Sequence, residues 1–143
     1  LRRARASGDA MIPTSTGAAK AMSLVLPSLK GKLDGTAIRV PTPNVSLIDL
    51  TFVTTKDVTS ESINDEMIKA SNGTLKGILA INSDPLVSKD FNHNPHSSIF
   101  DITQTQVGTT IRFTLYHDCL SRRQRRNHQP NRLRTTFQRN IRR

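Results

Sequence analysis

The sequence has no tryptophan, one tyrosine and a single cysteine, Cys119, among its 143 residues. One cysteine excludes an internal disulfide and is typical of a reducing compartment. No apolar run approaches the length that crosses a bilayer, and the first residues are charged without an apolar stretch behind them. We therefore expect a soluble, cytoplasmic protein that has no membrane partner.

Acidic residues are scarce in the last quarter of the chain. Residues 1–107 carry 11 basic and 10 acidic residues, whereas residues 108–143 carry 10 basic residues, all of them arginine, and one acidic residue. Two interpretations of residues 108–143 remain open. In the first, the segment binds nucleic-acid phosphates, with a steep dependence on salt, or acts as a nuclear-import signal. In the second, it is a frameshifted or mispredicted end without a selected role. We favour the second interpretation and expect an arginine-rich tail that is disordered in either case.

Residues 11–107 alternate between helical and extended patterns. Helices are expected at residues 18–26 and at residues 59–72, where one face carries Ile63, Met67, Ile68 and Ala70. Strands are expected at residues 36–40, 45–55, 79–81 and 99–107, and residues 82–98 have the composition of a loop. The turn at residues 41–44 (PTPN) should pair the first two strands antiparallel. We therefore predict an α+β domain, a mostly antiparallel sheet with helices on one face.

The segment at residues 12–20 (IPTSTGAAK) combines a helix start with groups that bind anions. Backbone N–H groups at Gly17 and Ala18, the hydroxyl of Thr16 and the positive end of the helix dipole suit a phosphate. Gly17 has no Cβ to keep an anion from the backbone. On these residues alone, an ordinary capped helix start is the favoured interpretation.

A longer set of motifs decides between these alternatives. Residues 12–20, 29–35 (LKGKLDG), 38–46 (IRVPTPNVS) and 95–101 (PHSSIFD), together with residues 1–6 and 75–79, stand in the order and spacing of one family. They closely resemble the catalytic domain of phosphorylating glyceraldehyde-3-phosphate dehydrogenase. The resemblance runs from residue 1 to about Val107, so we expect a partial catalytic domain at residues 1–107.

The resemblance implies a role for four residues. Thr16 and Gly17 match the family's phosphate-binding positions, Arg39 matches an arginine that reaches both phosphate sites, and Arg3 matches an arginine near the same site. It also implies NAD as cofactor, glyceraldehyde 3-phosphate and inorganic phosphate as ligands, a homotetramer and a place in glycolysis. The family's nucleophilic cysteine motif, its catalytic histidine and its cofactor domain are absent from these 143 residues. We therefore expect a chain that keeps phosphate-binding residues but is inactive alone.

Two other clusters are weaker candidates for a catalytic or metal-binding site. His117, Asp118 and Cys119 look like a catalytic set, but activation of a cysteine needs a fixed electropositive environment, which we do not expect in a tail. His93 and His96 resemble metal ligands, yet no third or fourth ligand lies nearby in the sequence, so surface histidines are the favoured interpretation.

Overall fold

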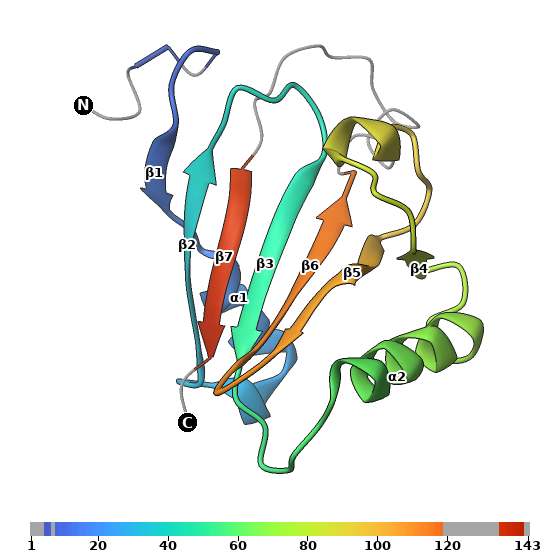
Figure 1. Cartoon of the computed structure of the whole chain (residues 1–143). Coiled ribbons are helices and arrows are strands. Elements are labelled where there is room, and N and C mark those ends of the chain that lie inside the picture. The colour runs from blue at the N-terminus through green and yellow to red at the C-terminus, as the bar shows by residue number, and fades with distance from the viewer. Residues whose placement is uncertain (1–4, 7, 119–134, 142–143) are drawn as a thin grey trace.

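A mixed β-sheet is the framework of the chain in the computed structural model, which describes residues 5, 6, 8–118 and 135–141 (Figure 1). Its strands are β1 (Ile12–Ser15), β2 (Leu33–Arg39), β3 (Ser46–Phe52), β4 (Leu79–Asn82), β5 (Ser98–Val107), β6 (Ile111–His117) and β7 (Thr135–Ile141). The helices are α1 (Ala18–Val25) and α2 (Ser60–Asn72), and two short 3-10 turns span Pro27–Leu29 and Ser88–Phe91.

The strand order across the sheet is β1-β2-β7-β3-β6-β5-β4. The antiparallel pairs are β1–β2, β2–β7, β3–β6 and β5–β6, whereas β3–β7 and β4–β5 are parallel. Helix α1 lies beside β2, and α2 lies beside β4 and β5. The predicted α+β class with a mostly antiparallel sheet is confirmed.

The predicted direct pairing of the strands on either side of the turn at residues 41–44 is wrong. β7 lies between β2 and β3, with Gln138 opposite Thr36 and Phe137 opposite Ile48. The connection therefore joins strands two spacings apart, roughly 10 Å. Val45 ends this connection with a φ of 65°, which is unusual for a β-branched residue. The turn residues at 41–44 predict that the chain reverses direction. They contain no information on how many other strands lie between the two strands that they connect.

The expectation of disorder over residues 108–143 is wrong for two stretches. β6 pairs with both β3 and β5, because its apolar residues complete the sheet's two faces. β7 pairs with β2 and β3 despite its polar composition. The rest of the predicted tail, residues 119–134 and 142–143, lies outside the described residues.

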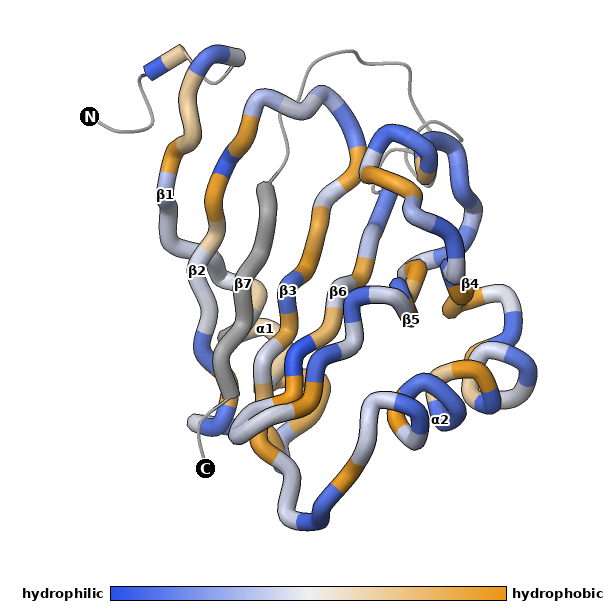
Figure 2. Tube along the Cα trace, viewed as in Figure 1, coloured by the Kyte–Doolittle hydropathy of each residue, from blue (hydrophilic) through white to orange (hydrophobic). Residues whose placement is uncertain are grey.

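The larger hydrophobic cluster lies between the sheet and α2. Its buried members are Leu79, Phe100, Ile111 and Phe113, and helix-side residues packed against them include Val58, Ile63, Met67 and Ala70. Phe113 makes edge contacts with Phe52 and Phe100, with ring centroids 5.4 and 5.2 Å apart. In Figure 2, hydrophobic and hydrophilic positions alternate along α2, as expected of a helix with one buried face. The predicted packing face of α2 is confirmed for Ile63, Met67 and Ala70.

The opposite face of the sheet carries a smaller cluster of Val45, Phe91, Ile99 and Tyr116. Phe91, at the end of the second 3-10 turn, stacks on Tyr116 with centroids 4.6 Å apart. Ile99 and Phe100 are consecutive on β5 and therefore point to opposite faces. Each face of the sheet is thus covered by a segment that follows β3 in the chain.

Helix α2 begins and ends where the sequence predicts. The Thr59 hydroxyl accepts from the Ser62 backbone N–H at 3.2 Å, and the Ser62 hydroxyl accepts from the Thr59 N–H at 3.0 Å. Glu61 stands in the first turn, where the helix dipole favours a negative charge. The helix ends at Asn72, and Gly73 is its C-cap.

Phe100 should be the most costly core residue to truncate. Its side chain is completely buried, so Phe100→Ala is expected to lower the free energy of unfolding by about 3–5 kcal/mol. Urea denaturation followed by circular dichroism measures this loss. Val107→Ala, at an exposed apolar position of the same strand, is the control and should shift the free energy by less than about 0.5 kcal/mol. Equal effects of the two variants would contradict the assignment of the core.

The phenol of Tyr116 should make the fold sensitive to alkali. Burial, assisted by the negative charge of Asp101, raises the pKa of Tyr116 above its usual value of 10.0. The resulting stability is complete below the unfolded-state pKa and is lost as the pH rises through the higher folded-state pKa. We expect the free energy of unfolding of wild type, relative to that of Tyr116→Phe, to fall above about pH 10. Parallel urea titrations between neutral and alkaline pH test this, and identical pH profiles would refute it.

Candidate functional site

The amino end of α1 follows directly from the edge strand β1. Ser15 ends the strand, Thr16 leaves it, and Gly17 is the N-cap residue with φ −83° and ψ −3°. The Ala18 N–H donates to Oγ1 of Thr16 at 3.1 Å, and the Ala21 N–H donates to the Gly17 carbonyl at 2.9 Å. The predicted start of the helix is confirmed.

Gly17 is exposed, and a Cβ built on it would meet no atom within 4 Å. Its φ is negative, so the conformation itself does not require glycine. The hydroxyl of Thr16 accepts one hydrogen bond and still carries a proton that it can donate. An exposed backbone and a hydroxyl donor at a helix amino end are suitable partners for an oxyanion.

Arg39 is the last residue of β2 and lies opposite Ile12 on β1. It shares a sheet face with Ile12 and Ala37, which are both buried. Its Nε atom is buried and has no hydrogen-bond partner among the described residues. A buried donor of this kind costs free energy unless an acceptor reaches it, and an anion gives a guanidinium its strongest hydrogen bonds.

The register shows how far apart these groups lie. Ser15 is opposite Thr36, so Thr16 lies one step beyond the last pair while Arg39 lies at the other end of the ladder. Four steps separate Thr16 from Arg39, roughly 13 Å between their backbones. The structure therefore brings Thr16 and Gly17 together and leaves Arg39 at a distance that a side chain and a ligand have to span. Arg3 lies outside the described residues.

The other candidate residues have identifiable structural surroundings. His93 has a φ of 65°, and its backbone N–H donates to Oδ2 of Asp118 at 2.8 Å. Nδ1 of His96 lies 2.9 Å from Oδ1 of Asn94. Within residues 5, 6, 8–118 and 135–141, no three His, Cys, Asp or Glu side chains gather as metal ligands do.

Sequence reasoning missed a buried polar junction at the end of β6. His117 is the last residue of that strand and Asp118 is 1% exposed, so their placement in a disordered tail was wrong. Nearby, Nδ2 of Asn44 donates to Oδ1 of Asn92 at 2.7 Å. The signal available in the sequence was the set of Asn and Asp residues in the flanking loops, which bind backbone groups readily. Cys119 lies outside the described residues.

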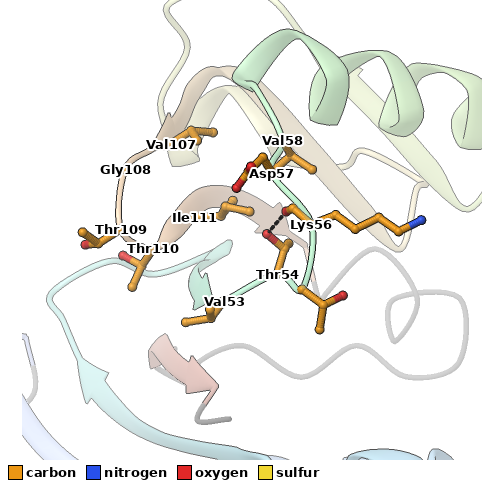
Figure 3. A pocket seen from close by; sticks show the side chains of 11 residues that line it. Val53, Thr54, Lys56, Asp57, Val58, Val107, Gly108, Thr109, Thr110 and Ile111 are labelled. Carbon is orange, nitrogen blue, oxygen red and sulfur yellow. Dashed lines mark hydrogen bonds between the residues drawn. The ribbon is translucent and has the colours of Figure 1, made fainter.

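A separate cleft of about 380 Å³ lies between residues 53–58 and 107–111 (Figure 3). Its lining is mostly polar, and one hydroxyl, Oγ1 of Thr54, already donates to the Lys56 carbonyl at 2.7 Å. In Figure 3 the Lys56 side chain extends away from the cleft. Of the predicted phosphate-binding residues, the three that the structure describes (Thr16, Gly17 and Arg39) do not line it.

No helix in the described part of the chain has the length and apolar character of a membrane span. The hypothesis of nucleic-acid binding concerns arginines that lie mostly outside the described residues, and it stays a prediction.

Comparison with known proteins identifies the family over a longer part of the chain than the sequence motifs do. Residues 1–117 match the family model described as glyceraldehyde 3-phosphate dehydrogenase, C-terminal domain. The chain is 58% identical over 120 residues to glyceraldehyde-3-phosphate dehydrogenase from Xanthobacter flavus and 55% identical over 120 residues to that from Cereibacter sphaeroides. It is 53% identical over 119 residues to glyceraldehyde-3-phosphate dehydrogenase 1 from Bacillus subtilis.

These alignments cover 82% of the chain but only 36% of each relative. The family match ends at residue 117, the last residue of β6, so the expected limit of the resemblance near Val107 was too early. The family match and these relatives show that the chain belongs to the glyceraldehyde-3-phosphate dehydrogenase family, with residues 1–117 matching its C-terminal domain.

Proposed function

We propose that this chain is the phosphate-binding part of an NAD(P)-dependent oxidoreductase that oxidises the aldehyde of glyceraldehyde 3-phosphate in glycolysis. The substrate's phosphate and inorganic phosphate bind to Thr16, Gly17 and Arg39. Arg3, which is not among the described residues, assists in this binding. The observation that carries the proposal is the buried, unpartnered Nε of Arg39 on the strand next to the Thr16–Gly17 helix start. Family membership supports it.

The distance between these groups favours two anion positions. A phosphate at the amino end of α1 accepts hydrogen bonds from the Thr16 hydroxyl and from the exposed backbone beside Gly17. The backbone of Arg39 lies roughly 13 Å away along the β1–β2 ladder. Its long side chain therefore binds a second anion, at the end of the ladder where Arg39 lies. A planar guanidinium suits this task because it offers several N–H donors to phosphate oxygens at once.

The proposed reaction needs groups that these 143 residues do not supply. The sequence has no G-x-G-x-x-G motif after a strand, the pattern with which a dinucleotide-binding domain holds a pyrophosphate. By resemblance, the nucleophilic cysteine and the histidine base also lie in a part of the family's chain outside this sequence. We propose that NAD and these groups come from that part, in a cytoplasmic homotetramer, and that the present chain is inactive alone.

Loss of Arg39 should weaken phosphate binding. Hydrogen bonds to a charged group contribute about 1.5–3 kcal/mol, so Arg39→Ala is expected to raise the Kd for inorganic phosphate roughly ten- to hundredfold. Isothermal titration calorimetry measures the Kd, and circular dichroism checks the fold. Arg39→Lys keeps the charge but loses the guanidinium fork, and we expect a partial loss.

The matched control for Arg39→Ala is Lys76→Ala, which also removes one positive charge but at an exposed position after α2. It should leave the Kd for phosphate unchanged. If the two variants weaken binding equally, phosphate responds to net charge alone and the proposed site is wrong.

The isolated chain should not catalyse the oxidation. Mixed with glyceraldehyde 3-phosphate, NAD and inorganic phosphate, it is expected to form no NADH above the rate without protein, because it lacks the nucleophile and the base. Absorbance of NADH measures the reaction, and a full-length relative under the same conditions is the positive control. A rate that rises in proportion to the concentration of this chain would contradict the proposal.

A further inference from the structure

The C-terminal end of α2 carries the only Asn-Gly pair in the sequence, Asn72–Gly73. Asn72 is the last residue of the helix and Gly73 is its C-cap, and both are exposed. An asparagine before glycine is chemically vulnerable, because a glycine backbone nitrogen has no neighbouring side chain to keep it from the asparagine amide. The pair therefore combines a reactive sequence with open access to water.

The helix restrains the nitrogen that would react. The Gly73 N–H donates to the Lys69 carbonyl at 2.9 Å and to the Ala70 carbonyl at 3.2 Å. The Leu75 N–H donates to the Ala70 carbonyl at 2.8 Å, the six-to-one bond that closes many helix ends. While these bonds persist, the Gly73 nitrogen is directed at the preceding turn and not at the Asn72 side chain.

The Asn72 side chain has no comparable restraint in the described part of the chain. Asn64, on the same helix, donates to the Ile102 carbonyl at 3.2 Å and accepts from the Thr105 hydroxyl at 2.7 Å. Asn82 donates to the Asp84 carbonyl at 2.7 Å. Helix ends open locally far more often than the whole domain unfolds, and Lys69 and Asn72 in the last turn of α2 are exposed.

We propose that Asn72 is a site of spontaneous deamidation whose rate is set by opening of the last turn of α2. The Gly73 nitrogen forms a bond to Cγ of Asn72 and loses its proton, and the side-chain amide nitrogen leaves as ammonia. Water then adds to the cyclic imide. Breaking the bond between the nitrogen and Cγ gives aspartate, whereas breaking the bond between the nitrogen and the backbone carbonyl carbon gives isoaspartate. No oxidant or reductant is consumed.

The product would disturb the helix end at which it forms. A new carboxylate at the C-terminus of a helix opposes the dipole. Lys69, three residues earlier, already pairs with Glu66 at 2.6 Å and is only partly available to offset the charge. Isoaspartate also lengthens the backbone, which is incompatible with the bonds from Gly73 and Leu75. This inference is independent of the proposed phosphate site.

The test compares deamidation at Asn72 in the folded full chain and in the same chain unfolded by guanidinium chloride, at mildly alkaline pH. Peptide mapping by mass spectrometry measures the amide remaining at Asn72 and at Asn64, the internal control. We expect Asn72 to convert in both samples, at least about tenfold more slowly in the folded one because only open helix ends react. Asn64 should keep its amide in the folded chain.

Two matched variants separate the effect of helix-end opening from the intrinsic reactivity of the Asn-Gly pair. Lys69→Gly places a glycine at an exposed position in the last turn of α2, which weakens that turn. The open form of the turn should become roughly fivefold more populated, and deamidation of Asn72 should accelerate by the same factor. Lys56→Gly makes the same change at an exposed position outside the helix and should have no effect. Equal rates in folded and unfolded chains, no conversion at Asn72 in the folded chain, or no acceleration by Lys69→Gly would each overturn the proposal.

Discussion

The alternation of side chains along β5 is the constraint on which both hydrophobic clusters depend. Ile99 and Phe100 are neighbours in the chain and almost wholly buried, yet they belong to different clusters on opposite faces. A slip of one residue in the pairing of β5 with β6 would exchange the two faces. The register that sets Ile99 opposite Tyr116 therefore fixes where α2 and the second 3-10 turn can pack.

Polar contacts add specificity around this framework. Arg112 on β6 donates from Nε and Nη2 to the two carboxylate oxygens of Asp49 on β3, at 2.8 and 2.7 Å. Hydrogen bonding to Asp49 and the negative charge of its carboxylate raise the pKa of Arg112. Because Asp49 is 7% exposed, the bond satisfies a carboxylate that would otherwise be buried without a partner. The pair links the neighbouring strands β3 and β6, whereas the proposed phosphate site lies on β1 and β2, toward one edge of the sheet.

The candidate site depends on that edge. β1 is four residues long, and its pairing with β2 links the helix start at Gly17 to the buried Nε of Arg39, while β7 pairs with β2 on the other side. Thr16 and Arg39 are 23 residues apart in sequence, and the antiparallel ladder brings them to the two ends of one short strand pair. The proposed anion positions therefore lie along β1 and β2, whereas the buried residues of both hydrophobic clusters lie mainly on β5 and β6.

The sequence by itself determined the family, the α+β class, the start of α1, the extent of α2 and the residues expected at the phosphate site, because these depend on local spacing, capping and motif identity. Only the tertiary structure decided that β7 separates β2 from β3, that β6 belongs to the domain, and that Asp118 is buried. Strand order and burial are set by contacts between residues distant in sequence, and a local pattern such as the turn at residues 41–44 contains no information about them.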